Sequence, residues 1–217
     1  MVSSLGGFSN LAGKTIRSLQ DLLITIQPLH LALYKPENLP EQCKLGEGAS
    51  YNVWKCLNRR SPSKDLVAVK KVKLPRGDSD FEAFQSRVAC VLKDIEVMNH
   101  PPLASCENIL SLLGYGWNMG EGSIPFLVTE LAPGGTLRQF LLENTSLRGL
   151  QKIKLCRDVM NGMSELHLAG VIHGDLKLDN ILVVAGMQAK INDFSHSILK
   201  STNQDGVEEG VYRGTEM

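Results

Sequence analysis

One short stretch of this 217-residue sequence gathers side chains that could catalyse a reaction together. The run VIHGDLKLDN contains Asp175, Lys177 and Asn180, and Asp193 follows thirteen residues after the last of these. A carboxylate such as that of Asp175 can accept a hydroxyl proton, while an amide and a second carboxylate supply the hard oxygen ligands that Mg²⁺ prefers. Each residue alone is compatible with an ordinary acidic loop. The ordered set favours transfer of a phosphoryl group, with Lys177 as a neighbouring cation.

Two further features could hold phosphates. Gly46 and Gly48 stand between strand-like runs in LGEGASYNV, and glycine lets backbone N–H groups approach a phosphate closely. This pattern alone is weak, because Tyr51 stands where G-x-G-x-x-G has its third glycine and most such turns are plain hairpins. Lys70 ends the run VAVK, where a buried lysine needs a counter-charge or a phosphate. A lysine reaching solvent from a strand edge is the alternative, but the 24 residues from Gly46 to Lys70 allow a return strand that brings the lysine under the glycine loop.

The apolar periodicity predicts the elements that would position these residues. Short strand-like runs dominate the first half, and helical spacing dominates after the turn PGG at 133–135. Strands are predicted over 53–57, 66–72, 109–113, 126–130, 181–184 and 189–191, and helices over 16–26, 80–98 and 147–166. Asp80 is the predicted N-cap of the second helix, and Gly170 is placed to end the third. The expected fold class is α+β, with a β-rich half that contains one long helix, followed by a helical half.

Charge and composition narrow the classes of partner. Lysine plus arginine equals aspartate plus glutamate, at 23 each, so no net field indicates nucleic acid or an anionic membrane. The most apolar early stretch, 22–33, is interrupted by polar residues and is shorter than the ~20 residues of a membrane span. Five scattered cysteines without a C-x-x-C pair favour reduced thiols in the cytoplasm, with the nucleus as an alternative, over disulfides or a zinc site.

Together, the four motifs resemble those of eukaryotic-type protein kinase domains. The glycine-rich loop, the VAVK strand, the HGDLKLDN loop and the DFS triplet occur in that family's order and at similar spacing over about residues 42–217. Lys177 is the serine/threonine-type variant of the catalytic loop, and the segment 91–117 looks like divergent kinase-like proteins of filamentous fungi. The resemblance implies a two-lobed kinase domain at 41–217, with an N-lobe at 41–132 and a partial helical C-lobe at 133–217, after an extension at 1–40.

The resemblance also implies roles for individual residues. Asp175 would be the catalytic base, Lys177 the phosphate-neutralising cation, and Asn180 and Asp193 the Mg²⁺ ligands. On the ATP side, Gly46, Gly48 and Lys70 would hold the phosphates, and Asp94 on the long helix would pair with Lys70. The adenine would lie between Leu45, Val53, Ala68 and Leu182, with Thr129 behind it and the backbone of Glu130 to Ala132 hydrogen-bonded to the base.

Several positions depart from the family pattern. Asp94 stands where the family has glutamate, so its pairing with Lys70 depends on helix position; Glu96 points about 200° away on that helix. Gly174 replaces the arginine before the catalytic aspartate, which makes control by phosphorylation of the activation segment less expected. Ser195 replaces the glycine of the D-F-G triplet, which reduces the freedom for a positive φ there.

The end of the sequence, GTEM at 214–217, matches the start of the segment that leads to A-P-E in the family. We therefore expect a C-terminally truncated domain whose activity on its own is doubtful, and whose helix at 147–166 exposes an apolar face that promotes self-association. The leading hypothesis is ATP-dependent phosphoryl transfer to serine or threonine hydroxyls of proteins. A nucleotide-binding, pseudokinase-like interaction module is the alternative, and a small-molecule phosphotransferase is a weaker third.

Overall fold

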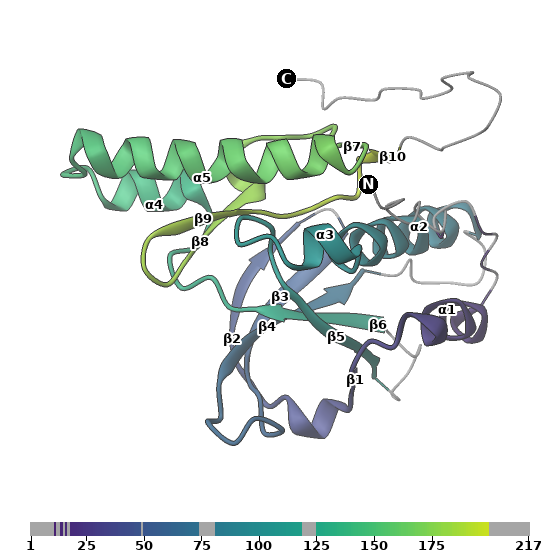
Figure 1. Cartoon of the computed structure of the whole chain (residues 1–217). Helices are drawn as coiled ribbons and strands as arrows, with labels where there is room; N and C mark the ends of the chain where they lie inside the picture. The colour runs from purple at the N-terminus through teal and green to yellow at the C-terminus, as the bar shows by residue number, and fades with distance from the viewer. Residues whose placement is uncertain are drawn as a thin grey trace, which may run out of the picture.

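The computed structural model describes residues 11, 14, 16, 18–48, 50–73, 81–118 and 125–199. The first part of the chain forms a six-stranded sheet with helices beside it, and the second part is helical and carries two small two-stranded sheets (Figure 1). The predicted two-lobed α+β fold is confirmed. None of the helices in the described ranges has the length and apolar content needed to span a bilayer.

The sheet of the first part has the strand order β1-β5-β6-β4-β3-β2. Its strands are β1 (Leu33–Tyr34), β2 (Glu41–Glu47), β3 (Tyr51–Leu57), β4 (Leu66–Val72), β5 (Leu112–Trp117) and β6 (Pro125–Glu130). All neighbouring strands are antiparallel except β1 and β5. The predictions at 53–57, 66–72 and 126–130 are confirmed. Strand β4 is buried on both faces from Val67 to Lys70, which explains why its apolar run is continuous rather than alternating.

The strand predicted at 109–113 is wrong in position. Strand β5 begins at Leu112, and Ile109 makes only an isolated bridge to another strand. The prediction ended before Gly114 and Gly116 because glycine weakens a strand that is judged by itself. In the structure β1 passes so close that a Cβ at either glycine would overlap a backbone oxygen of residue 32 or 34. A contact with a distant segment therefore decides where this strand lies.

Two longer helices accompany the sheet. Helix α2 (Phe81–Met98) confirms the predicted long helix; its expected N-cap, Asp80, lies outside the described residues. Helix α1 (Leu19–Ile26) confirms the predicted short helix and begins with a capping box between Ser18 and Asp21. Its buried residues Leu22 and Ile26 pack into the same apolar cluster as the buried face of α2. The segment before residue 41 thus contributes both a strand and a helix to the first part of the fold.

The remaining elements are short, apart from one long helix. They are η2 (Gln27–Leu29), η3 (Pro36–Asn38), α3 (Pro101–Ala104), α4 (Leu137–Glu143), α5 (Gly149–Leu168), β7 (Val171–Ile172), η4 (Leu178–Asn180), β8 (Ile181–Val184), β9 (Gln188–Ile191) and β10 (Ile198–Leu199). Helix α5 confirms the predicted long helix, and Gly170, with φ of 77°, follows its end as expected. Helix α4 was not predicted, because its seven residues are too few for periodicity to show.

The hairpin of β8 and β9 is fastened to the first part of the chain by the segment before β5. The N–H of Leu110 donates to the carbonyl of Ile191, and the N–H of Ile191 donates to the carbonyl of Asn108, both at 2.9 Å. Helix α5 approaches from the other side so closely that a Cβ at Gly162 would crowd the Asn108 carbonyl. Asp193, two residues beyond β9, is therefore positioned by contacts from both parts of the molecule.

Candidate active site

Lys70 lies on β4, and its ammonium is buried against α2. Its Nζ is 2.9 Å from Oδ2 of Asp94, and the two side chains are only 6% and 0% exposed. The predicted ion pair is present, because α2 packs closely enough for the short aspartate side chain to reach the lysine. Glu96 points elsewhere and accepts a hydrogen bond from the N–H of Leu11 at 3.1 Å.

Asp94 also fixes the segment that follows β9. Its Oδ1 accepts a hydrogen bond from the N–H of Phe194 at 2.8 Å, and Phe194 is fully buried. Asn192 directs its Oδ1 to the Nζ of Lys70 at 3.4 Å. The buried ion pair therefore holds the residues on both sides of Asp193. The sequence analysis missed Asn192, whose only signal was its place next to the DFS triplet.

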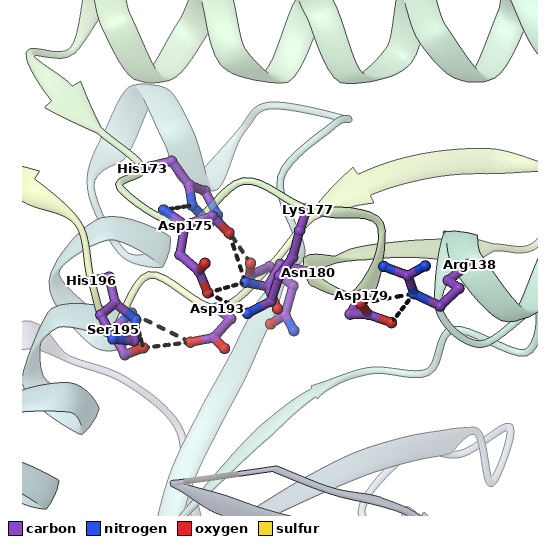
Figure 2. A network of polar contacts seen from close by, with 10 residues as sticks. Arg138, His173, Asp175, Lys177, Asp179, Asn180, Asp193, Ser195 and His196 are labelled. Carbon is purple, nitrogen blue, oxygen red and sulfur yellow. Dashed lines mark hydrogen bonds and ion pairs between the residues drawn. The ribbon is translucent and has the colours of Figure 1, made fainter. Parts of the chain in front are cut away.

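Asp175, Lys177 and Asn180 form one cluster, as the dashed lines in Figure 2 show. The Nζ of Lys177 lies 2.7 Å from Oδ2 of Asp175. The Nδ2 of Asn180 donates to the same carboxylate oxygen at 3.0 Å and to the Asp175 carbonyl at 2.8 Å. Since the amide nitrogen of Asn180 is engaged in this way, its amide oxygen is the atom left for a metal ion. The three residues predicted to be catalytic are thus brought together.

His173 supports this cluster from within the core. Its Nδ1 accepts a hydrogen bond from the N–H of Asp175 at 3.3 Å, and its Nε2 lies 3.2 Å from the carbonyl of Asn192. Its ring also contacts that of Phe194, with 5.4 Å between the ring centroids. Burial lowers the pKa of His173. A neutral ring with its proton on Nε2 satisfies both hydrogen bonds, so His173 positions the backbone of Asp175.

In the DFS triplet the positive φ lies at a different residue from the one that the sequence analysis considered. Asp193 itself has a left-handed φ of 65°, whereas Ser195 does not have a positive φ. The backbone of Ser195 therefore does not need the positive φ that a serine would restrict. The hydroxyl of Ser195 donates to Oδ1 of Asp193 at 2.7 Å, as Figure 2 shows, and so orients the proposed metal-binding carboxylate.

The backbone conformation at position 174 and the space around it explain why a glycine stands there. Its φ is 79°, and a Cβ at this position would overlap the carbonyl oxygen of His196. The HGDLKLDN loop and the segment after the DFS triplet therefore touch through their backbones here. A neighbouring contact adds to this: Nζ of Lys93, on α2, donates to the carbonyl of Ser197 at 2.8 Å.

The residues predicted to surround ATP lie on adjacent strands. Val53 is in register with Gly46 on β2 and with Lys70 on β4, and Ala68 is in register with Thr129 on β6. Leu45 and Gly48 are exposed at the glycine-rich hairpin, Ala132 follows β6, and Leu182 lies on β8. The contact of these residues with a nucleotide stays a prediction.

Glu130 has a structural partner that the sequence did not indicate. Its Oε1 lies 2.7 Å from the Nζ of Lys190 and accepts a hydrogen bond from the N–H of Ser111, also at 2.7 Å. The side chain thus links β6 to β9 and to the segment before β5. The side chain of Glu130 therefore has structural partners, and the predicted recognition of the adenine base rests on the backbone of this residue.

The donor atoms suit one class of metal site. No group of three or more histidine, cysteine, aspartate or glutamate residues in the described ranges could hold a metal ion. Asn180 and Asp193 offer a pair of oxygen ligands, which is the protein contribution that Mg²⁺ needs when water and phosphate oxygens complete its octahedron. All five cysteines are free thiols.

Comparison with known proteins agrees with this arrangement. A family model described as protein tyrosine and serine/threonine kinase matches residues 39–211. The serine/threonine-protein kinase PknL of Mycobacterium tuberculosis is 30% identical over 171 residues, which cover 78% of this chain and 39% of the relative. Serine/threonine-protein kinase 10 of Xenopus tropicalis is 31% identical over 160 residues, which cover 71% and 15%. The serine/threonine-protein kinase ste20 of Aspergillus fumigatus is 29% identical over 151 residues, which cover 70% and 16%.

The chain spans 39% or less of the length of these three relatives, which come from a bacterium, a frog and a fungus. A specific kinship with fungal proteins therefore stays a prediction. The family match extends over most of the chain and includes the glycine-rich hairpin, the buried Lys70–Asp94 pair, the Asp175 cluster and the DFS triplet. On these grounds the chain belongs to the protein tyrosine and serine/threonine kinase family.

Proposed function

We propose that this chain transfers the γ-phosphoryl group of ATP to serine or threonine hydroxyls of a protein. The observation that carries the proposal is the Asp175 carboxylate, which Lys177 and Asn180 hold from two sides at 2.7 and 3.0 Å. A carboxylate fixed in this way can accept the proton of a substrate hydroxyl as that oxygen attacks phosphorus. The serine/threonine preference rests on Lys177 and on the names of the relatives.

The two cofactors of the proposal are ATP and Mg²⁺. Lys70, with the glycine-rich hairpin, would hold the phosphates, and Asn180 and Asp193 would hold the metal ion through their oxygens. Mg²⁺, when bound, neutralises phosphate charge. The residues of the chain orient the reacting groups: Ser195 fixes the Asp193 carboxylate, and His173 fixes the backbone of Asp175.

Nucleotide binding and transfer are tested separately. Mg-ATP should raise the melting temperature of the parent chain, and the double variant Lys70→Met, Asp193→Asn should abolish that rise. Asp175→Asn should keep the rise but lower phosphoryl transfer to serine and threonine substrates by about 10²- to 10⁴-fold, because the base acts on the hydroxyl and not on ATP. Asp179→Asn is the matched control: this neighbouring carboxylate is bound by Arg138 at 2.9 Å and should not matter for transfer.

A nucleotide-binding interaction module is the alternative that this experiment can favour. Tyr51, in place of the third glycine, and Ser195, in place of the last glycine of D-F-G, are the features that support it. A thermal shift with Mg-ATP, together with no transfer by the parent chain, would replace the kinase proposal with this module. Absence of any thermal shift at millimolar Mg-ATP would remove the ATP site from both proposals.

We also propose that the chain by itself self-associates through an exposed apolar face of α5. Leu150, Ile153 and Met160 lie on this face and are 80%, 63% and 70% exposed. Apolar side chains exposed together mark a surface that binds another apolar surface.

The five free thiols support the cytoplasm, or the nucleus, as the proposed place where the chain acts.

A further inference from the structure

Tyr51 occupies a special place beside the candidate nucleotide site. It begins β3 at the position where the G-x-G-x-x-G pattern has its third glycine. Because side chains alternate along a strand, Tyr51 and Val53 face the same side of the sheet, and Val53 is in register with Lys70. Tyr51 is only 6% exposed, and its ring centroid lies 4.5 Å from the Nζ of Lys70.

The contacts of Lys70 are complete without a phosphate. A lysine ammonium has three N–H donors. The Nζ of Lys70 meets Oδ2 of Asp94 at 2.9 Å, Oδ1 of Asn192 at 3.4 Å and the ring of Tyr51 at 4.5 Å. The residue as a whole is 5% exposed. A phosphate that binds Lys70 must therefore take the place of one of these three partners, and the ring is the partner that comes from the glycine-rich hairpin.

The backbone of the glycine-rich hairpin also makes a hydrogen bond within itself where a phosphate could bind. The backbone N–H of Gly48, which could meet a phosphate, donates instead to the carbonyl of Tyr51 at 2.9 Å. Tyr51 thus engages both the ammonium and one loop N–H of the site. Burial, and next to it the charge of Asp94, raise the pKa of the Tyr51 phenol well above its ordinary value, so the ring contacts Lys70 as a neutral aromatic group.

We propose that Tyr51 is an internal cover over Lys70, which the phosphates of a nucleotide must displace, so that it lowers the affinity for ATP without changing the affinity for the adenosine part. This inference rests on the proposed function, since it concerns the same site. An aromatic ring over a lysine ammonium corresponds to roughly 2- to 30-fold in an equilibrium constant. Removal of the ring should therefore tighten ATP binding by about that factor.

The test compares ATP with adenosine, which has no phosphates. In titration calorimetry Tyr51→Gly should bind Mg-ATP roughly 2- to 30-fold more tightly than the parent chain, while adenosine affinity stays the same. Tyr51→Phe keeps the ring and should keep the parent's ratio of the two affinities. Tyr34→Ala is the matched control, because it removes a second tyrosine ring that contacts a cation. Tyr34 lies on β1, away from the site, and its ring centroid is 4.9 Å from the Cζ of Arg60.

A second readout needs no nucleotide. Acylation of Lys70 by a small amine-reactive reagent, followed by peptide mass spectrometry, should be faster in Tyr51→Gly than in the parent chain and unchanged in Tyr51→Phe. Tyr51→Leu fills the buried space without an aromatic face, and it replaces the glycine variant in the calorimetric assay if that variant does not fold.

The outcomes separate this inference from the proposed function. An unchanged ratio of ATP to adenosine affinity in Tyr51→Gly and Tyr51→Leu, with both ligands bound, would overturn the cover and leave the ATP site standing. If neither ligand binds any variant, the proposed function fails, and equal acylation rates in all variants would then also refute the contact between Tyr51 and Lys70.

Discussion

The buried carboxylate of Asp94 makes two different contacts, one with Lys70 and one with the backbone of Phe194. One oxygen of Asp94 neutralises the lysine, and the other accepts the N–H of Phe194. A charge left in the core without its counter-charge is costly, because the low dielectric of the interior offers no substitute for water. The stability of the first part of the fold and the position of Asp193 therefore depend on the same carboxylate.

Asp94→Ala should lower the free energy of unfolding by about 3–5 kcal/mol, the usual cost of leaving one member of a buried ion pair unpaired. Urea denaturation followed by circular dichroism measures this change. Asp179→Ala is the control, because its ion pair with Arg138 lies at the surface and should contribute only about 0–1 kcal/mol. Equal losses for the two variants would show that Lys70 finds another partner.

His173 should make folding sensitive to acid in the absence of divalent metal. Its folded pKa is lowered by burial, so the unfolded chain binds a proton first as the pH falls. The stabilising contribution is complete above the unfolded pKa of about 6.5 and is lost as the pH drops below it. The unfolding free energy, measured in EDTA between pH 7.5 and 5, should fall less in His173→Gln than in the parent chain. His167→Gln, at an exposed position on α5, should behave like the parent; a parent-like slope in His173→Gln would refute the assignment.

At the scale of elements, the HGDLKLDN loop and the segment after the DFS triplet are joined by close backbone contact. Strand β7 before the loop pairs with β10 after the triplet, at Ile172 with Ile198 and Val171 with Leu199. The contact of Gly174 with the His196 carbonyl continues this pairing on the loop side of Ile172 and Ile198. The two segments are thus held together by backbone contacts, with glycine rather than arginine at position 174.

Gly174→Ala tests this contact against a matched glycine. Both Gly174 and Gly186 have a left-handed φ, at 79° and 73°, so alanine strains either backbone by roughly 1–2 kcal/mol. At Gly186 nothing lies within 4 Å of an added Cβ, whereas at Gly174 the His196 carbonyl would be overlapped. Gly174→Ala should therefore destabilise the protein clearly more than Gly186→Ala in thermal melts. Equal losses would mean that the two segments move apart easily.

At the scale of the whole molecule, α5 carries apolar residues on two opposite faces. Leu155, Gly162 and Leu166 are buried against the rest of the protein, while Ile153 and Met160 lie on the other side of the helix. Figure 1 shows this helix at the edge of the molecule, above the hairpin of β8 and β9. No element of the described residues covers the outer face.

Self-association through this outer face gives a direct prediction. Sedimentation velocity of the 217-residue chain at increasing concentration should show a rising average mass, and the double variant Ile153→Glu, Met160→Glu should suppress the rise, because charge opposes burial of that face. Ile24→Glu, at a 59% exposed position on α1, is the control and should associate like the parent. A concentration-independent monomer in the parent chain would contradict the prediction.

The sequence by itself determined the order of the chemical motifs and most of the elements that carry them. Glycines two apart, a lysine ending an apolar strand and carboxylates at fixed spacing are local features, because backbone freedom and periodicity depend on near neighbours. For the same reason the long helices α2 and α5 and the strand β4 could be placed, and Lys70 could be identified as needing a partner.

Only the tertiary structure decided which groups meet. The reach of Asp94 to Lys70, the ring of Tyr51 over the same ammonium, and the fit of Gly174 against His196 each join segments that lie roughly 20 or more residues apart. Such contacts leave no periodic signal in the chain, since they depend on how closely two packed elements approach. The position of β5 was predicted wrongly for this reason: its glycines read as strand breakers until the backbone of β1 is seen beside them.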